Sequence, residues 1–71
     1  MNLKVNRKYK ITALPNDIMI ARRLCELGFY VGNIILLKKV SLLKKSYLFI
    51  CRNVAISLSK NIVEQLVLIY E

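Results

Sequence analysis

The side chains that could carry out acid–base or nucleophilic chemistry are few in this chain of 71 residues. Histidine, the commonest general base, is absent, so no Ser-His or Cys-His pair can form. The four carboxylates are spread along the chain without a close pair for acid and base roles: Asp17, Glu26, Glu64 and Glu71. We therefore predict a binding module with no catalytic residues, and not an enzyme.

Metal and cofactor sites have equally little support. Cys25 and Cys51 lie far apart and form no CxxC spacing, which argues against a zinc knuckle or a redox pair. We expect both thiols to be buried and to serve in packing. Gly28 and Gly32 are the only glycines, whereas a phosphate-binding loop needs more. The sequence predicts no metal ligand and no bound cofactor.

Net charge is the strongest signal in the composition. Lys and Arg number 12 against 4 Asp and Glu, which gives a formal charge of +8. An excess of this size favours an anionic partner, whether a nucleic acid, a lipid headgroup surface or an acidic protein face. Solubility explains the charge equally well, because a small apolar chain needs charge to stay monomeric.

The elements that must position these charges begin with a strand and a helix. Residues Lys8–Leu14 alternate with the period of a half-buried strand, and Pro15 ends it. Asn16 and Asp17 provide N-cap chemistry, and Gly28 suits the left-handed end of a helix. The pattern therefore predicts one helix of about three turns between these caps.

On a helical wheel, this helix presents an apolar arc to the core and the charged side chains Arg22 and Glu26 on the opposite side. Arg23 flanks the arc, where its stem can lie along apolar surface while its guanidinium stays in water. The arc consists of a main stripe and three residues expected to widen it: Ile20, Leu24 and Leu27, with Ile18, Ala21 and Cys25.

Four further strands are predicted by apolar runs between turn signals. They are Asn33–Val40, Ser46–Arg52, Val54–Leu58 and Leu66–Tyr70. Phe29–Gly32 and Ser41–Lys45 are the expected turns before and after the first of these strands. Asn53 tolerates the positive φ of a tight turn, and Ser59 is expected to cap a helical turn that runs through Gln65.

Five short strands cannot form two stacked sheets of useful size, so closure into a small barrel is the economical way to remove sheet edges. We predict a mainly β fold, a five-stranded SH3-like barrel. An α-helix lies in its first connection and a short helical turn precedes its last strand. Residues 1–71 are expected to form a single domain.

A membrane span needs about 20 consecutive apolar residues. The longest stretch without a charged side chain, Leu27–Leu37, is shorter and contains Gly28, Gly32 and Asn33. Basic residues also interrupt the apolar positions near the N-terminus, so this segment lacks the continuous apolar block of a signal peptide. We expect a cytoplasmic protein that does not span the membrane.

One segment of the chain resembles a known family signature. The run from Arg23 to Gly32, followed by residues 33–37, is similar to the pattern R-L-x-x-L-G-(hydrophobic)-x-x-G-x-x-(I/V) of the FeoA family. Residues 42–52, 54–58 and 62–68 look like the family's hairpin, its I-x-L strand and its A-x-x-I-x-V ending. The signature positions also have structural roles: Leu24 and Leu27 plug the barrel, Gly28 ends the helix and Gly32 turns the chain.

The resemblance implies a cytoplasmic accessory of bacterial ferrous iron uptake that binds the GTPase region of the membrane transporter FeoB. FeoA-like proteins have no established catalytic activity, and the same barrel occurs as the C-terminal domain of iron-dependent repressors. The chain departs from the family in three ways. Asn53 stands where glycine is common, the hairpin at Leu42–Ser46 lacks a frequent Gly-Pro, and the charge is unusually basic.

The partner surface is predicted from exposed basic and aromatic positions, although a merely solvated face would look the same. Its members are Arg22, Arg23, Tyr30, Lys38, Lys39, Lys44 and Lys45. A second hypothesis is a small basic barrel that binds RNA or DNA, with Tyr47, Phe49 and Arg52 beside the hairpin lysines. A metal-sensing barrel is a third, which the lack of histidine disfavours. Apolar residues on both faces of Ser46–Arg52 make self-association possible.

Overall fold

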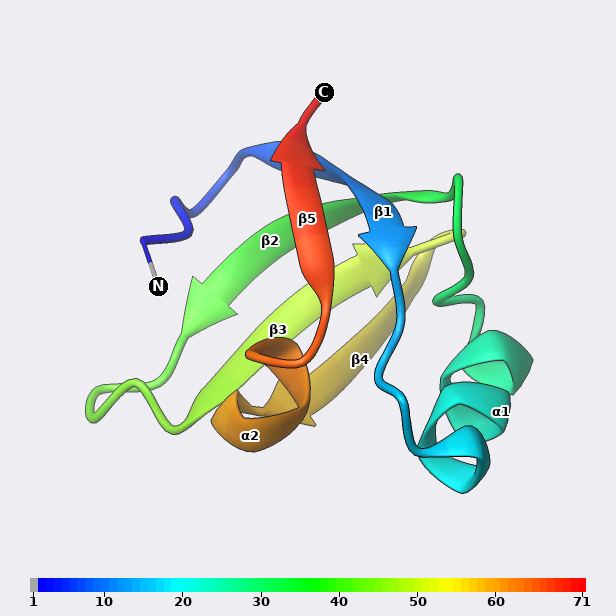
Figure 1. The fold of residues 1–71 in the computed structure, drawn as a ribbon. Coiled ribbons are helices and arrows are strands. Elements are labelled where there is room, and N and C mark those ends of the chain that lie inside the picture. The colour runs from blue at the N-terminus through cyan, green and yellow to red at the C-terminus, as the bar shows by residue number, and fades with distance from the viewer. Residues whose placement is uncertain (1) are drawn as a thin grey trace.

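A computed structural model describes residues 2–71 and shows five strands and two helices in one chain path (Figure 1). The elements are β1 (Lys8–Ala13), α1 (Ile18–Leu27), β2 (Ile34–Val40), β3 (Ser46–Cys51), β4 (Val54–Ser59), α2 (Lys60–Val63) and β5 (Val67–Tyr70). The strands form a single sheet in the order β4-β3-β2-β1-β5, and every neighbouring pair is antiparallel. Each predicted element is present, within about two residues of its predicted ends for the strands and the first helix.

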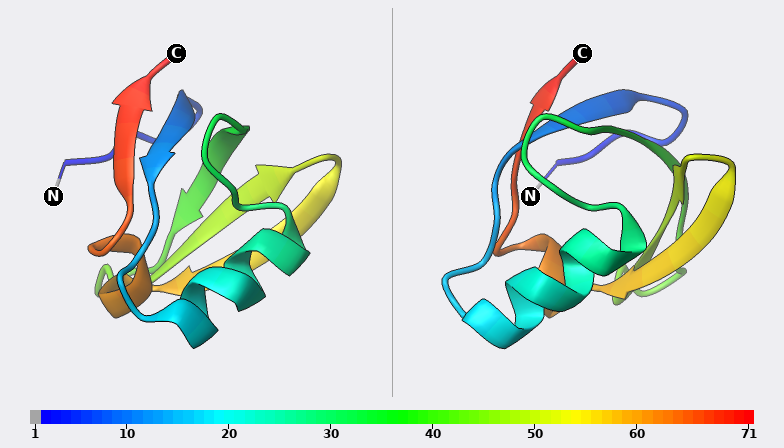
Figure 2. Two further views of the ribbon diagram at one scale, coloured as in Figure 1. Left: turned by 45° about the vertical axis from the view of Figure 1, so that its right-hand side comes forward. Right: turned by 90° about the vertical axis from the view of Figure 1, so that its right-hand side faces the viewer.

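The sheet curves until its two halves face each other across the core, with β2 shared between them (Figure 2). Register shifts between Ile11 and Ala13 and between Leu37 and Lys39 interrupt the ladders where the sheet bends. The end strands β4 and β5 are not neighbours in the sheet, and the single turn α2 connects them. This topology confirms the predicted SH3-like barrel.

The core is formed by the inward faces of the strands together with four residues from the connections, Leu24, Phe29, Val63 and Leu66. Tyr9 and Ile11 alternate with exposed lysines on β1, and Tyr47, Phe49 and Cys51 alternate with half-buried residues on β3, as their periods predict. Phe29, expected only as part of a turn, is fully buried and meets Phe49 edge to face at 5.9 Å between ring centroids. The loop after α1 therefore contributes to the core as well as reversing the chain.

Both ends of α1 match their sequence signals. The Asp17 carboxylate accepts hydrogen bonds from the Met19 and Ile20 amides at 2.9 and 3.2 Å. At the other end Gly28 has φ 103°, its N–H donates to the Cys25 carbonyl, and the Phe29 N–H donates to the Leu24 carbonyl. This is the pair of bonds of a Schellman motif, so the predicted stop is confirmed.

The predicted apolar arc of α1 is too wide. Leu24 is buried and Ile20 and Leu27 are half-buried, but Ile18 is 70% exposed and Cys25 is also exposed. The helix rests on the barrel by its central stripe alone, and no described element covers its outer residues. The prediction of a buried thiol is therefore confirmed for Cys51 and wrong for Cys25.

Candidate functional site

The seven predicted partner-binding residues are all exposed, but the structure divides them into two groups. Arg22 and Arg23 lie on α1, and Tyr30 follows it in the loop to β2. The lysines lie at the end of β2 and in the hairpin that joins it to β3: Lys38, Lys39, Lys44 and Lys45. Figures 1 and 2 show α1 and this hairpin on opposite sides of the barrel, so the two groups do not form one surface.

On the α1 side, the helix does not close completely over the barrel and leaves an apolar groove of about 300 Å³. One wall is the α1 stripe and the other comes from β4 and α2. The groove is lined by Met19, Ile20, Arg23, Leu24, Leu27, Leu58 and Ile62. Arg23 is the one charged member, so the groove can hold apolar side chains beside a single cation.

The rim of this groove adds to its apolar surface. Met19, like Ile18, is 70% exposed, so two adjacent large side chains of the first helical turn stand in solvent. Among residues 2–71 the one ion pair joins Lys60 and Glu64 at 3.9 Å, which leaves the Arg23 guanidinium free to meet an acidic group. An exposed apolar patch with a charged edge is typical of a protein-binding site.

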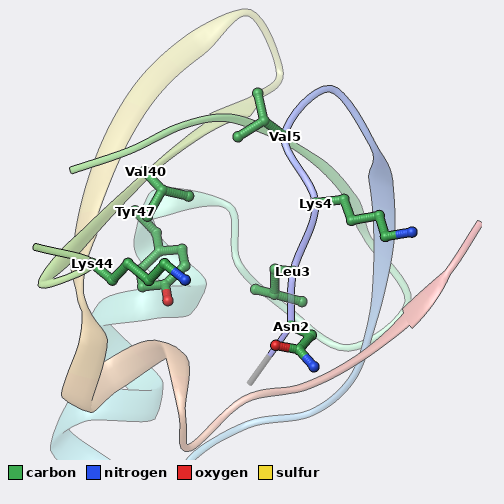
Figure 3. Close-up of a pocket in the computed structure, with 7 residues that line it drawn as sticks. All are labelled: Asn2, Leu3, Lys4, Val5, Val40, Lys44 and Tyr47. Carbon is green, nitrogen blue, oxygen red and sulfur yellow. The ribbon is translucent and has the colours of Figure 1, made fainter. Parts of the chain in front are cut away.

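A larger cavity of about 500 Å³ lies between the N-terminal segment and the base of the β2–β3 hairpin. Leu3 and Val40 contribute apolar walls, and the Lys4 backbone N–H donates to the Tyr9 hydroxyl at 2.7 Å. In Figure 3 the Lys44 side chain lies beside Tyr47, whereas Lys4 extends away from it. The two amino groups therefore do not converge on an anion.

One expected interaction disagrees with the structure. Tyr47 and Phe49 are buried, so they cannot stack on nucleic-acid bases as the RNA or DNA hypothesis required. The outward residues of the same strand, Leu48 and Ile50, are half-buried, and self-association through this strand stays a prediction. Within residues 2–71, no group of three or more His, Cys, Asp or Glu side chains is placed to hold a metal ion. No helix in that part of the chain has the length and apolar character to cross a bilayer.

The comparison with protein families decides the identity of this fold. The sequence model of the FeoA domain matches residues 1–69. The chain belongs to the FeoA family. A search of curated proteins gives no match to this chain.

Among solved structures, the chain is similar to the solution NMR structure of the FeoA protein from Chlorobium tepidum. The TM-score is 0.89 at 19% sequence identity, over 97% of this chain and 66% of that chain. At this identity the similarity shows the fold. The present chain thus spans just under two thirds of the length of that FeoA protein.

The FeoA signature residues act as structural parts around the end of α1. Leu24 is buried, and Leu27 lines the groove. A Cβ at Gly28 would lie 2.9 Å from the Cys51 Sγ, because the Cys51 thiol and the Asn33 amide both donate to the Gly28 carbonyl. Glycine is therefore required at position 28 both by the positive φ and by the close approach of the Cys51 side chain. Gly32 has φ 94°, and a Cβ added there would have no neighbouring atom within 4 Å. The positive φ alone therefore explains the glycine at this position.

Sequence reasoning missed most of the apolar surface of this FeoA fold. Met19, Leu58 and Ile62 line the groove but come from three different elements, and nothing local in the sequence brings them together. Leu42 and Leu43, in the predicted turn, are exposed at the tip of the hairpin. Here a signal existed, because two adjacent leucines flanked by lysines are unusual in a turn that needs only polar residues.

Proposed function

We propose that this protein is a non-catalytic cytoplasmic accessory of ferrous iron uptake that binds the cytoplasmic GTPase region of a FeoB-type transporter. Family membership supports the iron-transport role. The observation that carries the binding proposal is the apolar groove between α1 and α2. Residues 1–71 act in this proposal as a single FeoA-like domain.

The groove is suited to an apolar segment of the partner. Its walls hold two exposed or half-buried α1 side chains, Met19 and Leu27, opposite Ile62 of α2. Burying one such side chain at an interface contributes roughly 1.5–3 kcal/mol before the cost of ordering the partner. Arg23 at the edge supplies one charge that can select an acidic neighbour of the inserted residue.

The experiment is co-purification with the FeoB cytoplasmic region, together with iron uptake in a deletion strain that is complemented by each variant. Met19→Ser removes an apolar lining residue that is mostly exposed, so the fold should persist while affinity falls by about tenfold or more. Val54→Ser is the matched control, since Val54 is 55% exposed at the start of β4 and lies outside the groove. Equal binding by both variants, or normal uptake without the protein, would refute the proposal.

A further inference from the structure

The tip of the β2–β3 hairpin carries two adjacent leucines that the protein does not cover. Leu42 is 97% exposed and Leu43 is 72% exposed, more than any other large apolar side chain among residues 2–71. Single exposed apolar side chains are common on protein surfaces. Two adjacent ones at the end of a projecting hairpin form an apolar patch whose transfer out of water is favourable. Figure 1 shows this hairpin extending beyond the barrel on the side away from α1.

The backbone of the tip is closed by its own hydrogen bonds. The Ser41 N–H donates to the Ser46 carbonyl at 3.0 Å, and the Lys44 N–H donates to the Ser41 carbonyl at 2.9 Å. The Ser41 hydroxyl accepts from the Lys45 and Ser46 amides at 3.0 and 3.1 Å. The turn thus holds both leucines outward, and it satisfies the backbone amides of Lys44, Lys45 and Ser46 within the hairpin.

Positive charge surrounds the two leucines. The register shift at Lys38 lets two consecutive lysines of one strand, Lys38 and Lys39, both reach solvent. Lys44 and Lys45 follow the leucines and are also exposed. No Asp or Glu occurs between Glu26 and Glu64, so no acidic side chain of this segment offsets the charge.

We propose that this hairpin docks the protein on the surface of a bilayer that contains anionic phospholipid. Leu42 and Leu43 enter the boundary between headgroups and acyl chains, and the flanking lysines contact headgroup phosphates. A bilayer fits these observations better than a protein partner because it accepts a convex apolar point without a matching pocket, while the long lysine stems keep their charges at the surface.

This inference goes beyond the proposed function and does not depend on it. The hairpin projects from the barrel on the side away from α1, although its base meets the start of α2, where the Lys60 N–H donates to the Lys45 carbonyl at 2.9 Å (Figure 1). The residues that line the groove all lie outside the hairpin, so lipid at the tip does not occupy the groove. Vesicles contain no transporter. A failure of vesicle binding would therefore leave the transporter proposal standing, and the reverse also holds.

The first test is flotation of the full chain with vesicles of phosphatidylcholine alone or of phosphatidylcholine with phosphatidylglycerol. We expect binding to the mixed vesicles and little to the neutral ones. Lys44→Gln with Lys45→Gln should weaken binding about 25-fold, at about fivefold for each lysine near an anionic surface. Lys8→Gln with Lys10→Gln is the matched control, because it changes net charge equally at exposed positions of β1. It should retain binding.

The leucines are tested separately from the charge. Leu42→Ser with Leu43→Ser leaves the net charge unchanged and should lower the affinity by at least about tenfold. Its unfolding temperature should match that of the unchanged chain, since both side chains stand in solvent.

Insertion can also be observed directly, because the chain has no tryptophan. Leu42→Trp should give a blue-shifted emission on mixed vesicles that brominated lipid quenches, whereas Val31→Trp, in the loop after α1, should not. Several results would overturn the proposal: no binding to mixed vesicles, equal weakening in the β1 control, full binding by the serine variant, or no spectral shift from position 42. Binding of the tip to an acidic protein without any vesicle binding would likewise assign it to a protein partner.

Discussion

Gly28→Ala is the substitution for which the structure gives the most complete account. An alanine at φ 103° occupies the left-handed region, which costs roughly 1–2 kcal/mol. Its Cβ would also lie 2.9 Å from the Cys51 Sγ and 3.0 Å from the Arg52 Nη2. The arginine end can swing into solvent, but the cysteine is buried in the core, and overpacking of that kind costs typically about 1–3 kcal/mol.

The two contributions together predict that Gly28→Ala lowers the free energy of unfolding by about 2–5 kcal/mol. Gly32→Ala is the matched control: φ is 94° but nothing lies within 4 Å, so only the conformational cost of about 1–2 kcal/mol applies. Chemical denaturation followed by circular dichroism measures both values. The difference between the two variants isolates the steric contribution.

A double variant tests the assigned cause. If the Cys51 thiol is the obstacle, Gly28→Ala in a Cys51→Ala background should be less damaging than in the native background, by about 1–3 kcal/mol of coupling. Additive effects, or equal destabilisation by Gly28→Ala and Gly32→Ala, would refute the reasoning and leave the left-handed φ as the whole explanation.

Three other predictions concern α1 and the cysteines. Leu24→Ala should lower the free energy of unfolding by about 2–5 kcal/mol through a cavity under the helix, measured by the same denaturation; a loss below about 1 kcal/mol would contradict the burial of Leu24. Asp17→Ala should lower it by about 0.5–2 kcal/mol because two amides lose their acceptor, and Asp17→Asn should restore most of that loss. A thiol reagent should label Cys25 in the native protein and Cys51 only after unfolding, which mass spectrometry of the peptides resolves.

The features that sequence predicted well are those that neighbouring residues determine. Asp17 and Gly28 set the limits of α1 through bonds to residues at most five positions away, and the alternation of Tyr47, Phe49 and Cys51 identifies the inner face of β3. The order of these elements restricts the topology enough to predict a small barrel. None of these inferences requires knowledge of how α1 sits on the sheet.

The features that sequence missed depend on that placement. A helical wheel assigns Cys25 to the apolar arc, but whether an arc residue is buried depends on how much of the helix the sheet covers. The residues next to Phe29 in the sequence indicate a turn, whereas its contact with Phe49 in the structure places it in the core. The sequence groups basic residues such as Arg22 and Lys44 into one partner surface, but they belong to α1 and to the β2–β3 hairpin, which lie on opposite sides of the barrel.

The pairing of β1 with β5 has a consequence for how the chain folds and opens. The meander β2-β3-β4 needs only hairpin contacts, whereas β5 must return to β1 from the far end of the chain, through partners such as Tyr9 and Tyr70. Closing a loop of that length is the slow step in small β proteins. We expect the β1–β5 seam to form last and, being short and at the sheet edge, to exchange its amide hydrogens first, ahead of the meander.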